Sequence, residues 1–452
     1  MIEKSKKICM FVLNPCTNDA RVLKEAATLG EAGYDVKIIA IISEDAPQFE
    51  EKKESFTIYR VQPRALLFYV KKILLMDNRK NGIAPKETVA TSQSQVRISN
   101  GKENGLADSF QISLPPSYSF RKIVKDKMRD FLRKFHRGST YISYWLKAKK
   151  LAVSFKADIY HAHDLNTILP AYLAAKKNRA KLVYDSHELY TERNTLIKES
   201  ALSKWMIRKF EMFLIRKADA VITVNHSIAV ELANLYKIPV PYVVMNCPDN
   251  RSAASNNLLR ERIGLNGNKK IILYLGSITF NRGLEESITA MRQVYGGILV
   301  IMGYGKPAYI DSLHREIQQV GVEDRVCFIP AVPPHEVVSV SASADIGIVP
   351  IQNACKSYYY CSPNKLFESM MAGLPVAASN FPELRRVVEE ANCGLLFDPS
   401  NPDEIARVLN TMIGDPILCD RMRESALSHA RKYSWEEESK KLLSAYETMF
   451  IP

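Results

Sequence analysis

Short runs of apolar residues recur along the chain and alternate with segments of helical period. The first run, Ile8 to Leu13, is continuous, as expected of a strand that is covered on both faces of a parallel sheet. A helix is predicted after it, because Asn18 or Asp19 can cap a segment whose apolar positions recur every three or four residues up to Gly33. The next apolar run covers residues 36–42. This strand–helix–strand order predicts a doubly wound α/β domain.

The same alternation returns after residue 157 and predicts the rest of an N-terminal half. Its strands are expected at residues 158–164, 181–188, 220–224 and 242–245, and its helices at residues 167–177 and 201–217. Two of these strands end in polar groups: the first in His163 and Asp164, the second in Asp185, His187 and Glu188. Ligands of open α/β sheets bind beyond the carboxyl ends of the strands, so we expect both clusters to lie near a substrate.

A second α/β unit is predicted after residues 246–257, which have the composition of a linker. Its strands are expected at residues 271–275, 298–302, 326–329, 346–349, 376–378 and 394–397, and its last helices at residues 404–412 and 419–432. We therefore expect an N-terminal domain of residues 1–245, a C-terminal domain of residues 258–432 and a terminal amphipathic helix of residues 433–452.

The region between residues 60 and 150 departs from this pattern. Residues 77–120 are polar and poor in large apolar groups, which predicts a mobile insertion. Residues 121–150 carry eleven Lys or Arg against two Asp, with aromatic residues interleaved. Such a helix suits an anionic membrane surface, and a solvated helix over a buried apolar stripe explains it equally well. Nucleic acid is a weaker interpretation, because no nucleic-acid-binding motif accompanies the charge.

Composition agrees with an ordinary globular chain that has an acidic partner. The 452 residues exceed one typical core, which favours two domains, and the formal charge of +13 favours an anionic ligand or surface. The eight cysteines show no C-x-x-C pair, which is typical of reduced thiols in a cytoplasmic protein. No apolar stretch approaches the roughly 20 residues that span a bilayer. We expect a cytoplasmic protein, either free or peripheral on the inner membrane face.

The stretch from Ser362 to Val376 carries the most specific chemistry. Ser362 is expected to cap a helix with Pro363 at its first position, and Gly373 ends it after about three turns. The free amides of its first turn and Lys365 would meet phosphates, and the carboxylate of Glu368 would accept two ribose hydroxyls. Taken alone, an ordinary capped helix with a surface Lys–Glu pair explains the stretch better.

The C-terminal half supplies the context that favours the chemical interpretation. GSITFNRG (276–283), GYG (303–305) and SPNKLFESMMAGLPV (362–376) together resemble the family-4 retaining glycosyltransferases, whose fold is GT-B: two Rossmann-like domains that face a central cleft. The resemblance covers nearly the whole chain except residues 60–150. It implies that Arg282 and Lys365 bind the donor pyrophosphate, that Glu368 binds the ribose, and that the terminal helix returns to the N-terminal domain.

Two departures from the family pattern limit what can be carried over. The family's first glutamate would fall at position 360, where this chain has Tyr360, so the donor sugar is not specified. Ser277 replaces the usual arginine of the first loop, so Arg282 and Lys365 remain as the positive charges for the two phosphates of the donor. A subgroup of the family with a PNKLFE helix also lacks this first glutamate.

By position, His163 resembles the family's histidine near the acceptor and the reacting carbon. His161, His163, Asp164, His187 and Glu188 are also residue types that bind zinc, but the resemblance implies neither a metal nor another cofactor. An ordinary core imidazole that bonds a neighbouring loop is an equally good explanation of His161. We expect His163, Arg282, Lys365 and Glu368 to be catalytic, and the remaining substrate contacts to be Gly276, Ser277, Gly303, Tyr304, Gly305, Tyr360, Asn364, Leu366, Phe367, Asp164, His187 and Glu188.

The expected reaction moves a sugar, hexosyl or N-acetylhexosaminyl, from a nucleoside diphosphate (UDP favoured) to a hydroxyl of a glycan or lipid-linked acceptor. Cell-surface polysaccharide or glycolipid assembly would be its setting. Two alternatives stay open. A sugar-nucleotide 2-epimerase shares the fold and would use His187 and Glu188 as acid and base, and a non-catalytic membrane-associated binding protein would explain the basic segment.

Overall fold

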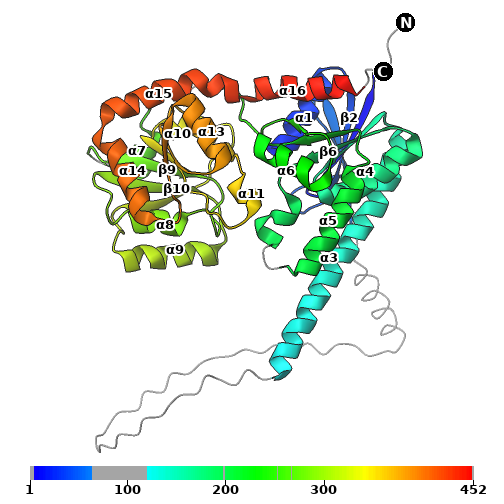
Figure 1. The fold of residues 1–452 in the computed structure, drawn as a ribbon, viewed down its shortest axis with the longest axis horizontal. Coiled ribbons are helices and arrows are strands. Elements are labelled where there is room, and N and C mark those ends of the chain that lie inside the picture. Colours follow the sequence, from blue (N-terminus) through cyan, green and yellow to red (C-terminus); the bar gives the residue numbers. More distant parts are fainter. Residues whose placement is uncertain (1–4, 64–119, 197–198, 252, 266, 450–452) are drawn as a thin grey trace, which may run out of the picture. The chain divides into compact units, whose positions relative to one another are not determined.

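The computed structural model describes residues 5–63, 120–196, 199–251, 253–265 and 267–449 (Figure 1). The predicted insertion of residues 77–120 therefore lies outside the described residues, apart from its last position. By its contacts the chain forms two compact units, residues 62–147 and the remainder. Helix α3, Phe120–Phe155, contains the basic stretch and begins in the smaller unit. Among the described residues, no helix is both long and apolar enough to cross a membrane.

The larger unit contains two sheets, and the first is built from the N-terminal half. Its strand order is β3-β4-β2-β1-β5-β6-β7-β8, and every neighbouring pair is parallel except β3 with β4. The strands are β1 Lys7–Phe11, β2 Asp35–Ile41, β3 Glu50–Lys52, β4 Phe56–Val61, β5 Ile159–His163, β6 Lys181–Ser186, β7 Ala220–Thr223 and β8 Tyr242–Val243. The helices between them are α1 Ala20–Glu31, α4 Leu165–Asn178, α5 Ala201–Ile215 and α6 His226–Tyr236, with short 3-10 turns at Tyr190–Glu192 and Asn194–Leu196.

The second sheet is wholly parallel, with the order β11-β10-β9-β12-β13-β14. Its strands are β9 Lys270–Leu275, β10 Gly297–Gly303, β11 Val326–Pro330, β12 Ile346–Val349, β13 Val376–Ser379 and β14 Gly394–Phe397. The helices are α7 Leu258–Arg262, α8 Leu284–Ala290, α9 Pro307–Val320, α10 Val337–Ser341, α11 Lys356–Tyr359, α12 Asn364–Met371, α13 Pro382–Ala391, α14 Pro402–Gly414 and α15 Pro416–Ala430. Two parallel sheets with crossover helices confirm the predicted α/β class.

The last helix, α16 (Trp435–Thr448), returns to the N-terminal half, as expected (Figure 1). Trp435, Leu442 and Tyr446 belong to the apolar core beneath the first sheet. The indole of Trp435 donates to the hydroxyl of Thr28 at 3.0 Å. The chain's end therefore completes the core that its beginning starts.

Two predicted helix starts have different outcomes. Asp19 caps α1, because its carboxylate accepts from the amide of Val22. The prediction for α12 is wrong: Pro363 is the cap residue, in extended conformation and without a side-chain bond, and the helix runs only from Asn364 to Met371. The hydroxyl of Ser362 instead accepts a hydrogen bond from the side-chain amide of Asn225 at 3.2 Å.

Candidate active site

Helix α12 places Lys365 in a buried position next to the second sheet. Leu366, Phe367 and Met370 anchor the helix in the apolar core, which turns Lys365 toward β9. There the Nζ atom lies 3.5 Å from the ring centroid of Tyr274 and has no hydrogen-bond partner. Burial, followed by the charge of Arg282, holds the pKa of Lys365 well below its usual range. Its surroundings thus oppose the charged form of the amine in the unliganded protein.

Arg282 supplies a second cation to the same region. It stands two residues before α8, and its guanidinium lies 4.5 Å from the ring centroid of Tyr358. Its Nε atom is buried without a hydrogen-bond partner. Two neighbouring cations with unused donors are unfavourable in a buried place unless an anion joins them.

The glycine-rich loops allow the backbone to approach this place closely. Gly276 has a φ of +109°, and a side chain there would point at the end of Lys365, whose Nζ would lie 3.9 Å from its Cβ. A side chain at Gly303 would collide with the Gly276 carbonyl. Ile278 bridges to Gly305, and its amide donates to the carbonyl of Tyr304. The two predicted loops therefore lie against each other.

The other predicted contact residues have the following surroundings. The side chains of Leu366 and Phe367 are fully buried, and the amide of Leu366 donates to the Pro363 carbonyl, so it is not one of the free amides expected there. Burial raises the pKa of Glu368, against the charges of Lys365 and Lys24. The backbone carbonyl of Tyr360 accepts from the Asn225 side chain at 2.7 Å. Ser277 contributes its carbonyl to the Tyr274 hydroxyl.

The N-terminal half contributes a network around Asp185. The register of β5 against β6 sets His163 beside Asp185. Asp185 Oδ2 accepts from His187 Nε2 at 3.0 Å and from His163 Nδ1 at 3.2 Å. Burial lowers the pKa of His163, so its ring is neutral, and its Nε2 atom has no hydrogen-bond partner. This leaves Nε2 as the acceptor of the ring.

The pKa values of His187 and Glu188 are both raised above their ordinary values. Burial opposes the charge on His187, but Asp164 and Asp185 raise its pKa to about 10. Burial, with Asp164, raises the pKa of Glu188 to about 7, and Arg193 lies 3.7 Å from its carboxylate. Asp164 has a φ of +63°, a strained value for a residue with a side chain. Its carboxylate accepts from the His187 amide, which holds the two strand ends together.

A charged pair on α1, Arg21 and Glu25, completes the network and was missed from the sequence. Both residues are buried, at the same phase as the apolar residues of the helix. The Nε atom of Arg21 lies 2.8 Å from Asp185 and 3.0 Å from Glu25. Although burial alone would raise the pKa of Asp185, Arg21 and His187 hold it well below its usual range. His161 donates to or accepts from the Tyr446 hydroxyl at 2.5 Å, so its partner is helix α16 rather than a loop.

Four of these residues also have the atom types of a metal site. Glu25, His161, His163 and Asp185 place one such atom each within 4.8 Å of one another, a different set from the one considered on sequence. The Arg21 guanidinium already lies 2.8 Å from Asp185, and burial raises the pKa of Glu25 to about 8 despite the nearby guanidinium, so the cluster does not hold two uncompensated negative charges. We therefore interpret the cluster as an ion-pair network.

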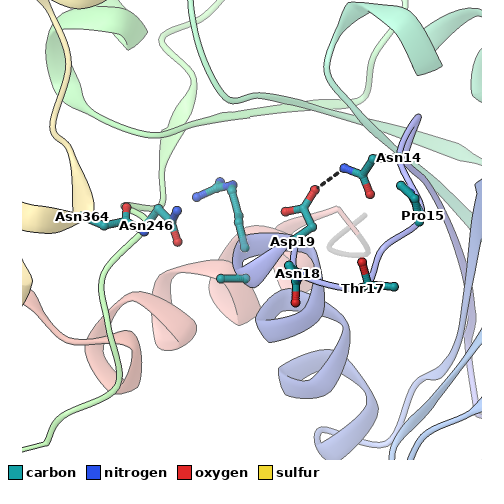
Figure 2. Close-up of a pocket in the computed structure, with 9 residues that line it drawn as sticks. Asn14, Pro15, Thr17, Asn18, Asp19, Asn246 and Asn364 are labelled. Atoms are coloured by element: carbon teal, nitrogen blue, oxygen red, sulfur yellow. Dashed lines mark hydrogen bonds between the residues drawn. The ribbon is translucent and has the colours of Figure 1, made fainter. Parts of the chain in front are cut away.

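A cavity of about 450 Å³ lies between the loop that precedes α1 and the start of α12 (Figure 2). Polar side chains dominate its lining, which consists of Asn14, Pro15, Thr17, Asn18, Asp19, Ala20, Arg21, Asn246 and Asn364. Of these, only Asn364 was predicted as a contact. Side-chain amides and hydroxyls that donate and accept in turn are suited to a ligand rich in hydroxyl groups. The lining of the cavity therefore suits a polyol, and its residue Asn364 is next in sequence to Lys365.

Comparison with known proteins gives two matching family models. Residues 112–248 match the model described as Glycosyltransferase Family 4, and residues 255–429 match the model described as Glycosyl transferases group 1. Among curated proteins, a D-inositol 3-phosphate glycosyltransferase of Xylanimonas cellulosilytica is 25% identical over 303 residues, covering 64% of this chain and 71% of that protein. An uncharacterised glycosyltransferase of Methanocaldococcus jannaschii is 27% identical over 308 residues, covering 65% and 75%.

Solved structures resemble the chain over almost its whole length. Sucrose-phosphate synthase from Thermosynechococcus elongatus aligns with a TM-score of 0.70 at 16% identity, covering 98% of this chain and 99% of that one. The Anabaena protein HepE in complex with UDP and glucose aligns with a TM-score of 0.64 at 15% identity, covering 98% and 100%. These likenesses confirm the predicted GT-B fold.

Proposed function

We propose that this chain, a glycosyltransferase of the GT-B fold, transfers a hexosyl or N-acetylhexosaminyl group from a UDP-sugar to an acceptor hydroxyl with retention of configuration. It would represent the subgroup with a PNKLFE donor helix. The assignment needs no metal and no other cofactor.

One observation carries the proposal: two basic side chains, the buried Lys365 in the first turn of α12 and the partly buried Arg282, each have a buried nitrogen atom without a hydrogen-bond partner. A diphosphate would satisfy both cations and the free amides at this helix end. As the sugar leaves, negative charge grows on the diphosphate, and fixed cations in a buried place stabilise that charge without reorganisation. The same geometry would thus serve binding and catalysis.

The nucleotide is proposed from one neighbour and one side chain. The Anabaena protein is described in complexes with UDP and with UDP-glucose, which favours a uridine nucleotide here. Glu368 lies three residues after Lys365 on the same helix, and its carboxylate would accept both ribose hydroxyls. Gly303, Tyr304 and Gly305 would line the base or sugar, and Tyr360 would stand near the sugar.

Retention suggests that the acceptor attacks on the face from which the diphosphate leaves. A leaving phosphate oxygen can then take the acceptor's proton, so no side-chain base is obligatory. His163 is neutral, and its Nε2 atom is free to accept from the acceptor hydroxyl and orient it. Asp185 fixes the imidazole through Nδ1, while Asp164, His187 and Glu188 would border the acceptor.

The acceptor is proposed to be a glycan or a lipid-linked glycan that enters through the polar cavity. The Xylanimonas relative is named for an inositol phosphate, and a phosphorylated polyol would also suit the amide lining and the net charge. Residues 121–150 would hold the enzyme at an anionic inner membrane surface in cell-surface polysaccharide or glycolipid assembly.

A donor screen tests the proposal. Thermal shift across the common nucleoside-diphosphate sugars is expected to show selective stabilisation by UDP-sugars in the presence of EDTA. UDP release should then depend on an added acceptor, and incubation with the donor alone should give no epimer. Stabilisation that is absent for every nucleotide, or an epimer formed without acceptor, would contradict the proposal.

A further inference from the structure

Helix α5 exposes a row of large apolar side chains. Leu202, Trp205, Met206 and Phe213 are each 53–65% exposed. Their spacing of three, four and seven residues puts them on one face of the helix, and their exposure shows that this face meets solvent. Scattered exposed apolar residues are common, but four on one helix face form a patch.

The opposite face of α5 holds the helix firmly on the domain. Leu214 and Ile215 are buried, and the buried carboxyl of Glu211 accepts from the hydroxyls of Tyr184 and Tyr236 at 2.8 and 2.7 Å. Ser200 caps the first turn. The exposed row is therefore presented by a fixed helix, and its side chains are not needed to attach it.

The charges that this segment itself carries are almost all positive, although Arg208 is paired with Glu192 at 3.0 Å. Residues 201–217 contain five basic residues, Lys204, Arg208, Lys209, Arg216 and Lys217, and one acid, Glu211, which is buried. The ammonium groups of Lys209 and Lys217 lie 5.8 Å from the rings of Trp205 and Phe213. An apolar row with aromatic rings and lysines at its edges has the composition of a helix that lies at a membrane interface.

We propose that the exposed face of α5 docks on an anionic membrane surface, with Trp205, Met206 and Phe213 among the acyl-chain boundary and the lysines at the headgroups. A second copy of this chain fits less well. Four half-exposed side chains offer roughly 400 Å², against the about 800 Å² that each partner buries in a standard interface. Pairing α5 with its own copy would also bring like charges together.

This inference extends the membrane partner of the proposed function, but it stands on residues outside the proposed catalytic set. Its test therefore needs no sugar transfer. Full-length protein is floated with vesicles of phosphatidylcholine alone and of phosphatidylcholine with phosphatidylglycerol. We expect binding to the anionic vesicles only. A Trp205→Ser/Phe213→Ser variant should lower the bound fraction at least tenfold, while residues 121–150 stay intact.

The matched control is Tyr295→Ser/Ile417→Ser, two side chains of the other sheet's domain that are 73% and 71% exposed. It should bind like the unchanged protein. A second readout uses tryptophan emission in a Trp145→Phe background, where Trp205 is exposed and Trp435 is buried. Anionic vesicles should shift the emission to the blue.

Three results would overturn the inference: no flotation of the unchanged protein, equal flotation of the α5 variant, or a dimer that the α5 variant converts to a monomer. The melting temperature and its response to UDP are measured on the same samples. An α5 variant that still responds to UDP but no longer floats supports docking. An unchanged protein that floats but ignores UDP defeats the proposed function and leaves the docking surface standing.

Discussion

Replacing Lys365 by methionine should strengthen the fold and remove donor binding at once. The Nζ atom of Lys365 is buried without a hydrogen-bond partner, and burial and Arg282 oppose its charge, so the unliganded protein is stabilised when the amine is removed. Methionine has a similar volume and keeps the apolar stem of the side chain. The donor, in contrast, would lose one of the two cations proposed to bind its diphosphate.

The two effects can be estimated separately. A buried polar or charged group without a partner costs about 1–3 kcal/mol or more, and the lost contact with the Tyr274 ring offsets about 1 kcal/mol of that. We expect a net gain of up to about 2 kcal/mol, or up to roughly 2 °C in Tm. Loss of one fixed donor to a developing charge should lower kcat by about 100- to 1000-fold.

The assay is thermal unfolding with and without UDP, followed by UDP release in the presence of acceptor. Lys269→Met is the matched control, because that lysine is exposed. Its ion pair is weak, with the Nζ atom 3.9 Å from the Asp324 carboxylate. The control should melt within about 0.5 kcal/mol of the unchanged protein and keep its UDP response. A less stable Lys365→Met variant that still responds to UDP would refute the reasoning.

Four further predictions follow from the same structure. UDP binding should take up protons, because the diphosphate raises the pKa of Lys365 from its lowered value, and calorimetry in buffers of different ionisation enthalpy measures this uptake. Glu368→Gln should reduce the preference for UDP over 2′-deoxy-UDP, since the carboxylate is proposed to accept both ribose hydroxyls. Burial raises the pKa of Glu211 to about 7, so the folded state binds more protons and its stability falls by about 3 kcal/mol as the pH rises from 4.5 to above 7; Glu211→Gln should flatten that fall in urea titrations. Arg21→Met should destabilise the fold by about 1–3 kcal/mol, because Asp185 loses its guanidinium partner and keeps only His187 and His163, and adding Asp185→Asn should restore part of that loss.

Each of these results has a clear opposite. Heat independent of the buffer would remove the titrating lysine, and an unchanged preference between the two nucleotides would remove Glu368 from the ribose. A Glu211→Gln variant with the same pH slope would show that the carboxyl is already ionised. Equal stability of the single Arg21 variant and the unchanged protein would show that the ion-pair network is not coupled.

Much of the fold was predictable because both sheets are parallel and buried on two faces. Strands β12 and β14 were predicted at their observed bounds, since each is a short apolar run between turns. Strands β3 and β4 were missed: β3 is the charged segment Glu50–Lys52, an edge strand whose pairing depends on a partner rather than on its own pattern. Strand β4 lies inside the sheet between β3 and β2 and was missed although its own residues are largely apolar, so its omission has no such explanation.

The candidate site was predictable only where one segment carries the chemistry. Lys365 and Glu368 lie on one helix, and their spacing was visible in the sequence. Ser362 was misjudged because the group that uses its hydroxyl, Asn225, is 137 residues away. Arg21 and Glu25 could have been found, because they interrupt the apolar phase of α1 with charges four residues apart.

The return of α16 has a consequence for how the protein is made. Synthesis proceeds from the N-terminus, and early domains usually fold before later ones emerge. Here Trp435, Leu442 and Tyr446 fill the core under the first sheet, and Tyr446 bonds His161. The core of the first half is therefore incomplete until the last helix has been synthesised. The first half can become native only after the second half has left the ribosome. A nascent or truncated chain that ends before Ser434 would expose that core to chaperones and proteases. Such a chain would not reach the native state.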